Sequence, residues 1–88
     1  MYYLYIIKNR SNKLYIGVSE DPEQRLREHN SQRGAQFTKN SFAFRIVFLE
    51  SYNTLSEARE REIQLKKWSR YKKDILIVRY QNGLETKA

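Results

Sequence analysis

Residues 2–18 read YYLYIIKNRSNKLYIGV, and the start of the fold follows from their pattern. Both ends of the stretch, residues 2–7 and 14–18, are rich in aromatic and β-branched residues, which favour β-strands. The residues between them, 9–12, read NRSN and are typical of a turn. The sequence therefore predicts that the chain begins with a β-hairpin.

The middle of the chain predicts one helix, one loop and one strand. Asp21 suits the N-cap of a helix and Pro22 suits its first position, so we expect a helix from there to about residue 30. Residues 31–43 are expected to form a long surface loop. A third strand is expected over residues 45–52, where apolar residues return.

Two further helices are predicted after the third strand. Thr54 and Glu57 form a capping box that begins a helix to about residue 68. Ser69 caps a shorter helix that ends near Gly83. The resulting order, β-β-α-β-α-α, predicts a single α+β domain whose three-stranded sheet consists of the hairpin and the third strand, flanked by helices.

Length and composition fit one small domain. The chain has 88 residues, so we assign residues 1–80 to the domain and residues 81–88 to a short C-terminal tail. The absence of cysteine excludes disulfide frameworks, thiolate zinc sites and cysteine nucleophiles. Because His29 is the only histidine, the chain by itself has no multi-histidine metal site.

Net charge indicates the class of partner. The chain has 17 Lys and Arg residues against 10 Asp and Glu residues, which gives a formal charge of +7. Such an excess is typical of proteins that bind a polyanion, either nucleic acid or an anionic membrane surface. No apolar run approaches the ~18 residues of a membrane-spanning helix. We therefore expect a cytoplasmic protein that binds nucleic acid rather than a membrane.

One acidic residue lies among apolar positions of the predicted helix over residues 54–68. The positions that share one helix face, at intervals of three or four residues, are Leu55, Ala58, Glu62 and Leu65. A carboxylate on the face that turns toward the core is unfavourable unless it is paired or bound to a cation. Glu62 either pairs with a neighbouring arginine, lies at the exposed edge of the row, or binds a metal ion such as Mg²⁺.

The predicted hairpin carries tyrosines on one face. Tyr3, Tyr5 and Ile7 share a face of the first strand, and Tyr15 and Gly17 share a face of the second. If the turn places Tyr5 opposite Tyr15, two phenol groups lie side by side; the alternative is that tyrosine is simply common in strands. Gly17 favours a functional face, because a glycine within a strand often marks the close approach of a ligand or another backbone.

Positive charge is concentrated in two stretches without acidic residues, 29–49 and 66–73. In addition, Arg25 and His29 are four residues apart and project from one face of the first predicted helix. Each pattern also fits a solvated surface, but two acid-free basic stretches favour a surface that follows phosphates. We predict nucleic-acid contacts at Gly17, Lys39, Lys66, Lys67, Arg70, Lys72 and Lys73.

Four motifs together resemble the GIY-YIG nucleases in their order and spacing. They are Tyr3-Leu4-Tyr5, Tyr15-Ile16-Gly17, Arg25 eight residues after that glycine, and Glu62 within its helix. The segments 34–38 and 66–70 are similar to the small, standalone, single-domain branch of this family, and the similarity covers nearly the whole chain. The chain departs from the family at Val18 and Asp74, where its excision-repair members often carry lysine and asparagine.

The resemblance implies a metal-dependent phosphodiesterase and a role for each of five residues. Glu62 would hold a single divalent cation, Mg²⁺ or Mn²⁺. Tyr5 would act as general base on the attacking water with Tyr15 as its partner, or the two roles would be exchanged. Arg25 would contact the reacting phosphate, and His29 would take part in positioning or proton transfer. Because a tyrosine has a pKa of about 10, such a base needs positive charge nearby.

The sequence supports two hypotheses of different classes. The first is an endonuclease that hydrolyses phosphodiester bonds in DNA, with single-stranded, branched or damaged DNA as candidate substrates and RNA not excluded. The alternative is a non-catalytic nucleic-acid-binding module in which tyrosines stack on bases and basic residues contact phosphates. The sequence leaves the oligomeric state open between a monomer and a homodimer.

Overall fold

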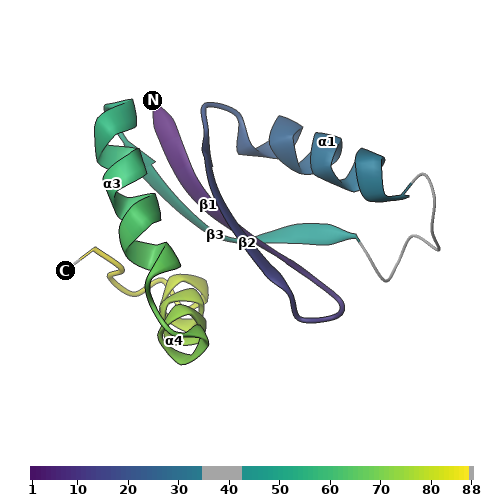
Figure 1. Ribbon diagram of the computed structural model, residues 1–88. Coiled ribbons are helices and arrows are strands. Elements are labelled where there is room, and N and C mark those ends of the chain that lie inside the picture. Colours follow the sequence, from purple (N-terminus) through teal and green to yellow (C-terminus); the bar gives the residue numbers. More distant parts are fainter. Residues whose placement is uncertain (35–42, 88) are drawn as a thin grey trace.

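A computed structural model of the protein describes residues 1–34 and 43–87. These residues form the elements β1 (Tyr2–Asn9), β2 (Leu14–Ser19), α1 (Pro22–Gly34), β3 (Phe44–Tyr52), α3 (Leu55–Lys66) and α4 (Arg70–Gln81). Their order along the chain is β-β-α-β-α-α (Figure 1). The predicted α+β class, with a hairpin and a third strand in one sheet, is therefore confirmed.

β1 is the central strand of an antiparallel sheet with the order β2-β1-β3. Because it has neighbours on both sides, β1 is buried from Leu4 to Ile7. A β-bulge between Ile6 and Ile7 interrupts its pairing with β3. The extra residue lets Val47 and Phe48, although adjacent in sequence, both join the same core. β2 and β3 each form an edge of the sheet.

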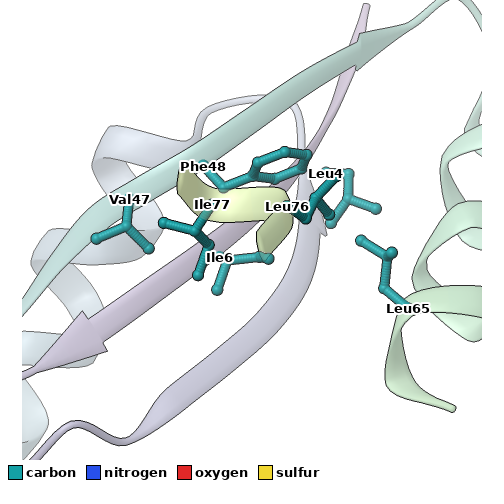
Figure 2. Packing of buried hydrophobic residues seen from close by; sticks show 7 residues of the cluster. All are labelled: Leu4, Ile6, Val47, Phe48, Leu65, Leu76 and Ile77. Atoms are coloured by element: carbon teal, nitrogen blue, oxygen red, sulfur yellow. The ribbon is translucent and has the colours of Figure 1, made fainter. Parts of the chain in front are cut away.

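Different helices cover the two faces of the sheet (Figure 1). On one face, α3 and α4 enclose the main core, which contains Leu4, Ile6, Val47, Phe48, Leu65, Leu76 and Ile77 (Figure 2). On the other face, a smaller cluster of Tyr5, Ile7 and Phe44 packs against Leu26 of α1. Full burial of one such side chain stabilises the fold by roughly 1.5–3 kcal/mol, so the main core is what holds α3 and α4 in place.

The predicted capping residues begin α3 and α4. The Thr54 side chain accepts a hydrogen bond from the backbone N–H of Glu57 at 3.2 Å. The Ser69 side chain accepts one from the backbone N–H of Lys72, also at 3.2 Å. Each bond satisfies an N–H group that the first turn of a helix leaves unpaired, so local sequence is enough to fix these two helix starts.

α1 is longer than the sequence predicts. It continues to Gly34, so the expectation of a loop over residues 31–43 is wrong for residues 31–34, and residues 35–42 lie outside the described residues. The physical reason is that no glycine or proline interrupts the chain between Pro22 and Gly34. Neither α1 nor any other helix of the described chain is long and apolar enough to cross a membrane.

The buried face of α3 is shorter than the predicted row. Ala58, Glu62 and Leu65 are buried, as their spacing predicts. Leu55 is exposed, so its expected place on the buried face is wrong. Because Leu55 is the first residue of the helix, it lies beyond the residues that reach the core.

The end of α4 turns the chain back toward β3. Gly83 adopts a positive φ of 73°, and the backbone N–H of Leu84 donates to the carbonyl oxygen of Arg79 at 2.9 Å. This Schellman arrangement reverses the chain direction at a position where glycine fits without strain. Lys87 then donates from Nζ to the carbonyl oxygen of Ser51 at 2.8 Å, so the C-terminal residues pack against the sheet.

Candidate active site

The Tyr5 side chain borders a pocket between β1 and α1. This pocket of ≈ 240 Å³ is lined by Tyr5, Arg25, Glu28 and His29. Nη1 of Arg25 lies 3.3 Å from Oε1 of Glu28. Hydrogen bonding to Tyr5 and then to Glu28 raises the pKa of Arg25 above its ordinary value. The pocket therefore combines a phenol, an imidazole and a permanently charged guanidinium that is paired with a carboxylate.

The hairpin register places Tyr5 over Gly17. Tyr5 lies opposite Gly17 and Tyr15 lies opposite Ile7, so the pairing of Tyr5 with Tyr15 does not occur. The turn helps to set this register, because Asn12 adopts a positive φ of 70°. A Cβ atom at position 17 would collide with the hydroxyl group of Tyr5. Gly17 therefore provides the space in which the Tyr5 ring lies.

Tyr15, His29 and Phe44 form an aromatic cluster next to this pocket. The ring centroids of Tyr15 and His29 are 4.8 Å apart, and those of His29 and Phe44 are 4.5 Å apart, both edge to face. Asn30 holds Phe44 in this cluster through two hydrogen bonds. Its Oδ1 accepts from the backbone N–H of Phe44 at 2.7 Å, and its Nδ2 donates to the backbone carbonyl oxygen of Phe44 at 3.0 Å. The fold thus brings together four predicted residues, Tyr5, Tyr15, Arg25 and His29.

Glu62 is a buried carboxylate with exposed partners. It is 8% exposed, and its two oxygens lie 3.1 Å from Nη1 of Arg59 and 3.1 Å from Nζ of Lys66. Both partner side chains are 56% exposed. Burial alone would raise the pKa of Glu62, but Lys66 and Arg59 outweigh burial and hold it below its ordinary value. Glu62 is therefore an ionised carboxylate whose partners are accessible to solvent.

Lys66 connects Glu62 with the aromatic cluster. Besides pairing with Glu62, it contributes to a cleft of ≈ 220 Å³ lined by Leu14, Tyr15, Ile16, Lys66 and Lys73. Tyr15 therefore contacts His29 on one side and borders this cleft on the other. The five predicted catalytic residues are linked in this way along the β2 edge of the sheet.

A family model for the GIY-YIG catalytic domain matches residues 1–74. The chain belongs to the GIY-YIG family. The match includes all five predicted catalytic residues, in the order in which the hairpin, α1 and α3 carry them. GIY-YIG domains define a nuclease family, which acts on nucleic acid and generally uses a divalent metal ion.

Its relatives are small GIY-YIG proteins of similar length. UPF0213 protein SSP2268 of Staphylococcus saprophyticus is 41% identical over 76 residues, which cover 86% of this chain and 93% of the relative. UPF0213 protein YazA of Bacillus subtilis is 33% identical over 84 residues, which cover 96% and 85%. The solution NMR structure of UPF0213 protein BH0048 from Bacillus halodurans is similar, with a TM-score of 0.57 at 32% identity over 89% of this chain and 84% of that chain. The resemblance to the single-domain branch is confirmed.

The Glu62 carboxylate is compatible with a divalent cation, because it is ionised and its partners are exposed. Within residues 1–34 and 43–87, no three His, Cys, Asp or Glu side chains gather closely enough to hold a metal ion by themselves. Mg²⁺ is often bound through one or two carboxylates, with water and substrate phosphates as its other ligands. A single ionised carboxylate therefore fits such an ion together with a substrate phosphate.

Other basic residues predicted to contact nucleic acid lie in varied surroundings. Nε of Arg70 lies 2.9 Å from Oδ1 of Asp74. Nζ of Lys72 lies 4.7 Å from the ring centroid of the neighbouring tryptophan. Lys67 is exposed directly after α3, and Lys39 lies outside the described residues. The predicted basic stretch is therefore divided among several faces of the molecule.

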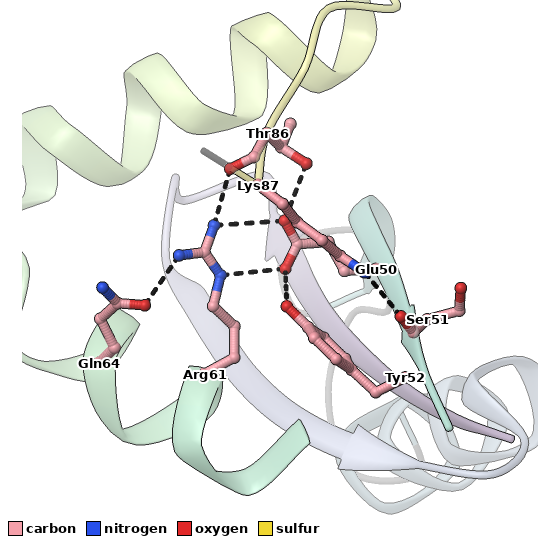
Figure 3. A network of polar contacts seen from close by, with 7 residues as sticks. All are labelled: Glu50, Ser51, Tyr52, Arg61, Gln64, Thr86 and Lys87. Carbon is pink, nitrogen blue, oxygen red and sulfur yellow. Dashed lines mark hydrogen bonds and ion pairs between the residues drawn. The ribbon is translucent and has the colours of Figure 1, made fainter. Parts of the chain in front are cut away.

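Sequence reasoning missed a second buried carboxylate, Glu50 on β3, which is 5% exposed (Figure 3). Arg61 pairs with it at two points, Nε to Oε1 at 3.0 Å and Nη2 to Oε2 at 3.2 Å. The hydroxyl groups of Tyr52 and Thr86 donate to the same carboxylate, each at 2.8 Å. Burial alone would raise the pKa of Glu50, but these partners together lower it.

A sequence signal for Glu50 does exist. Glu50 follows Phe48 by two residues in the predicted third strand, so the two share one face of the sheet. A carboxylate on the face of a core phenylalanine requires a partner, in the same way as Glu62 on its helix. The partners themselves, Arg61 and Thr86, lie too far along the chain for local patterns to identify.

Proposed function

We propose that this chain is a metal-dependent endonuclease that hydrolyses phosphodiester bonds in DNA. The proposal rests mainly on the linked set of side chains along the β2 edge, Tyr5, Tyr15, Arg25, His29 and Glu62. Membership of a nuclease family supports the same chemistry. In this proposal residues 1–80 are the nuclease domain and residues 81–88 a short C-terminal tail.

Tyr5 is the proposed general base. Its hydroxyl group lies beside the Arg25 guanidinium, which supplies positive charge where a phenolate would form. Tyr5 would take a proton from the attacking water. Tyr15 would be its partner through the shared neighbour His29, or the two tyrosines would exchange these roles.

Arg25 is proposed to contact the reacting phosphate as well. Its side chain is exposed while Glu28, on the same helix, holds one of its nitrogens. A guanidinium group matches two phosphate oxygens at once and stays charged at any pH of interest. His29 packs against Tyr15 at the border of the same pocket, which supports a role in positioning or proton transfer.

Glu62 would hold one divalent cation, Mg²⁺ or Mn²⁺. When bound, such an ion polarises the phosphate and stabilises the leaving oxygen. The lowered pKa of Glu62 keeps its oxygens ionised near neutral pH. Arg59 and Lys66 are the side chains that would yield their contacts to the cation, and both lie largely in solvent.

A cleavage panel tests the proposal. Labelled single-stranded, duplex and branched DNA and labelled RNA are incubated with Mg²⁺ or Mn²⁺, and in parallel with chelator. We expect DNA nicking that requires metal, and a loss of about 100-fold in Arg25→Ala, since removing one donor that stabilises transition-state charge has effects of this size. Arg27→Ala is the matched control, because Arg27 is exposed on the same helix and does not line the pocket.

The competing outcome is a non-catalytic nucleic-acid-binding module. It predicts salt-sensitive binding that persists in chelator and no cutting with any metal. That combination would overturn the proposal. Cleavage of RNA alone would keep the chemistry and correct the substrate class.

A further inference from the structure

We propose that the cleft between β2 and the α3–α4 corner holds a backbone phosphate of the bound strand other than the one that is cleaved. This inference rests on the proposed function, because it names where the substrate strand passes beyond the catalytic pocket. The cleft of ≈ 220 Å³ is lined by Leu14, Tyr15, Ile16, Lys66 and Lys73. Its lining residues come from the edge strand and from both helices on that side of the sheet.

The cleft combines an apolar floor with two ammonium groups. Leu14 and Ile16 of β2 are half-buried and offer a surface along which lysine stems pack. Lys66 already faces the carboxylate of Glu62, so its charge is partly balanced. Lys73 forms no ion pair with any acidic side chain of the described chain. The site therefore carries excess positive charge, which suits the single negative charge of a phosphodiester.

Tyr15 sets the path of the strand. It lies between the pocket that contains Arg25 and the cleft that contains Lys73. A strand with its scissile phosphate at Arg25 therefore passes over Tyr15 before a neighbouring phosphate reaches the cleft. Because Tyr15 is exposed, its ring also offers a surface on which a base can stack.

Other basic residues of the same stretch do not face this cleft. Lys72 precedes Lys73 by one position, and its ammonium group lies over the Trp68 ring on another face of α4. Lys72 lines a different pocket, together with Trp68 and Leu76. Contrary to the sequence prediction of a nucleic-acid contact at Lys72, this residue therefore lies outside the proposed path of the strand, which makes it a matched control for Lys73 with the same charge on the same helix.

The test measures binding without cleavage. A fluorescently labelled single-stranded DNA is titrated by anisotropy in chelator, at salt concentrations from about 50 to 200 mM. Loss of one phosphate contact lowers the salt slope by about 0.7 for a single strand, which corresponds to about fivefold weaker binding at roughly 0.1 M salt. We expect this loss for Lys73→Ala and less than about a twofold change for Lys72→Ala.

Glu62→Gln should change the affinity for DNA in the opposite direction to Lys73→Ala. It removes the carboxylate that balances Lys66, so we expect tighter binding in chelator than that of the parent chain. Unchanged affinity would contradict the assignment of Lys66 to the cleft.

The outcomes separate this inference from the proposed function. Equal losses in Lys73→Ala and Lys72→Ala would overturn the cleft and indicate a diffuse basic surface, and so would an absence of binding by the parent chain. A selective loss in Lys73→Ala, in a protein that cuts no substrate with any metal, would support the cleft and overturn the nuclease proposal. A selective loss together with metal-dependent cutting would support both.

Discussion

Two buried carboxylates, Glu50 and Glu62, lie in this small domain with the same charge and a lowered pKa in both cases. They differ in their partners. Glu50 is held at two points by Arg61, whose side chain is only 12% exposed, and by hydroxyl groups from β3 and from the C-terminal residues. Glu62 is held by two side chains of its own helix, each 56% exposed.

Burial and ion pairing alone therefore do not distinguish a structural carboxylate from a functional one. The partners of Glu50 come from separate elements, so the network joins β3, α3 and the C-terminal residues (Figure 3). The partners of Glu62 lie three residues before and four residues after it on α3, so both ion pairs stay within one helix. Such exposed pairs contribute about 0–1 kcal/mol, so stability does not account for the position of Glu62.

The largest expected effect is the difference in stability between two matched variants. Glu50→Gln leaves the charge of Arg61 buried without a counter-ion, which should lower the free energy of unfolding by about 3–5 kcal/mol. Glu62→Gln leaves Arg59 and Lys66 in solvent, and the expected loss is about 1 kcal/mol or less. Urea denaturation of the two variants and the parent measures this difference. Equal losses of unfolding free energy in the two variants would contradict the distinction between Glu50 and Glu62.

The two carboxylates should also differ in how strongly they make stability depend on pH. Although burial raises the pKa of Glu50, Arg61, Thr86 and Tyr52 lower it below 4.5 in total. Ionised Glu50 therefore stabilises the fold above about pH 4.5, and this contribution is lost as the pH falls through the lower pKa of the folded state. Urea midpoints measured from about pH 6 to about pH 3 should fall less steeply in Glu50→Gln than in the parent.

Glu62→Gln should keep most of the parent's dependence on acid. The pKa of Glu62 is also lowered, but its partners are more than half exposed and water screens their charges. Parallel curves for the parent and Glu50→Gln would contradict the account of both carboxylates.

A smaller effect is expected where the C-terminal residues meet Glu50. Thr86→Val keeps the shape of the side chain and removes the hydroxyl group that donates to Oε2 of Glu50. A hydrogen bond to a charged group contributes about 1.5–3 kcal/mol, so the free energy of unfolding, obtained from urea denaturation, should fall by an amount in this range. Thr86→Ser keeps the donor and is the control. Equal midpoints for Thr86→Val and the parent would show that the network does not need its C-terminal member.

Local signals predicted most of the fold. The starts of α3 and α4 follow from Thr54 and Ser69, whose caps need only the next three residues. The hairpin follows from two β-rich stretches around a turn, but its register depends on the backbone of Asn12 and the space over Gly17, which composition does not encode. For this reason the sequence left open whether Tyr5 lies opposite Tyr15, and in the structure it lies opposite Gly17 instead.

Those residues of the candidate site whose pattern lies within a single helix or strand could be predicted from the sequence. Glu62 stands out because its helical spacing places a carboxylate on a buried face. The Glu50 network was not predictable in the same way, because Arg61 and Thr86 lie 11 and 36 residues away in sequence. The cleft beside Tyr15 likewise depends on packing between β2, α3 and α4, which bring Lys66 and Lys73 together.

The most direct test of the central claim, that Glu62 serves cleavage and not stability, is the nicking rate of Glu62→Gln on labelled DNA with Mg²⁺ or Mn²⁺. Glu60→Gln is the control, since Glu60 is an exposed acid on the same helix. For Glu62→Gln we predict a nicking rate at least about 100-fold below that of the parent, and a free energy of unfolding within about 1 kcal/mol of the parent's. For Glu60→Gln we predict no change in either quantity. A Glu62→Gln variant that cuts as fast as the parent would contradict the account.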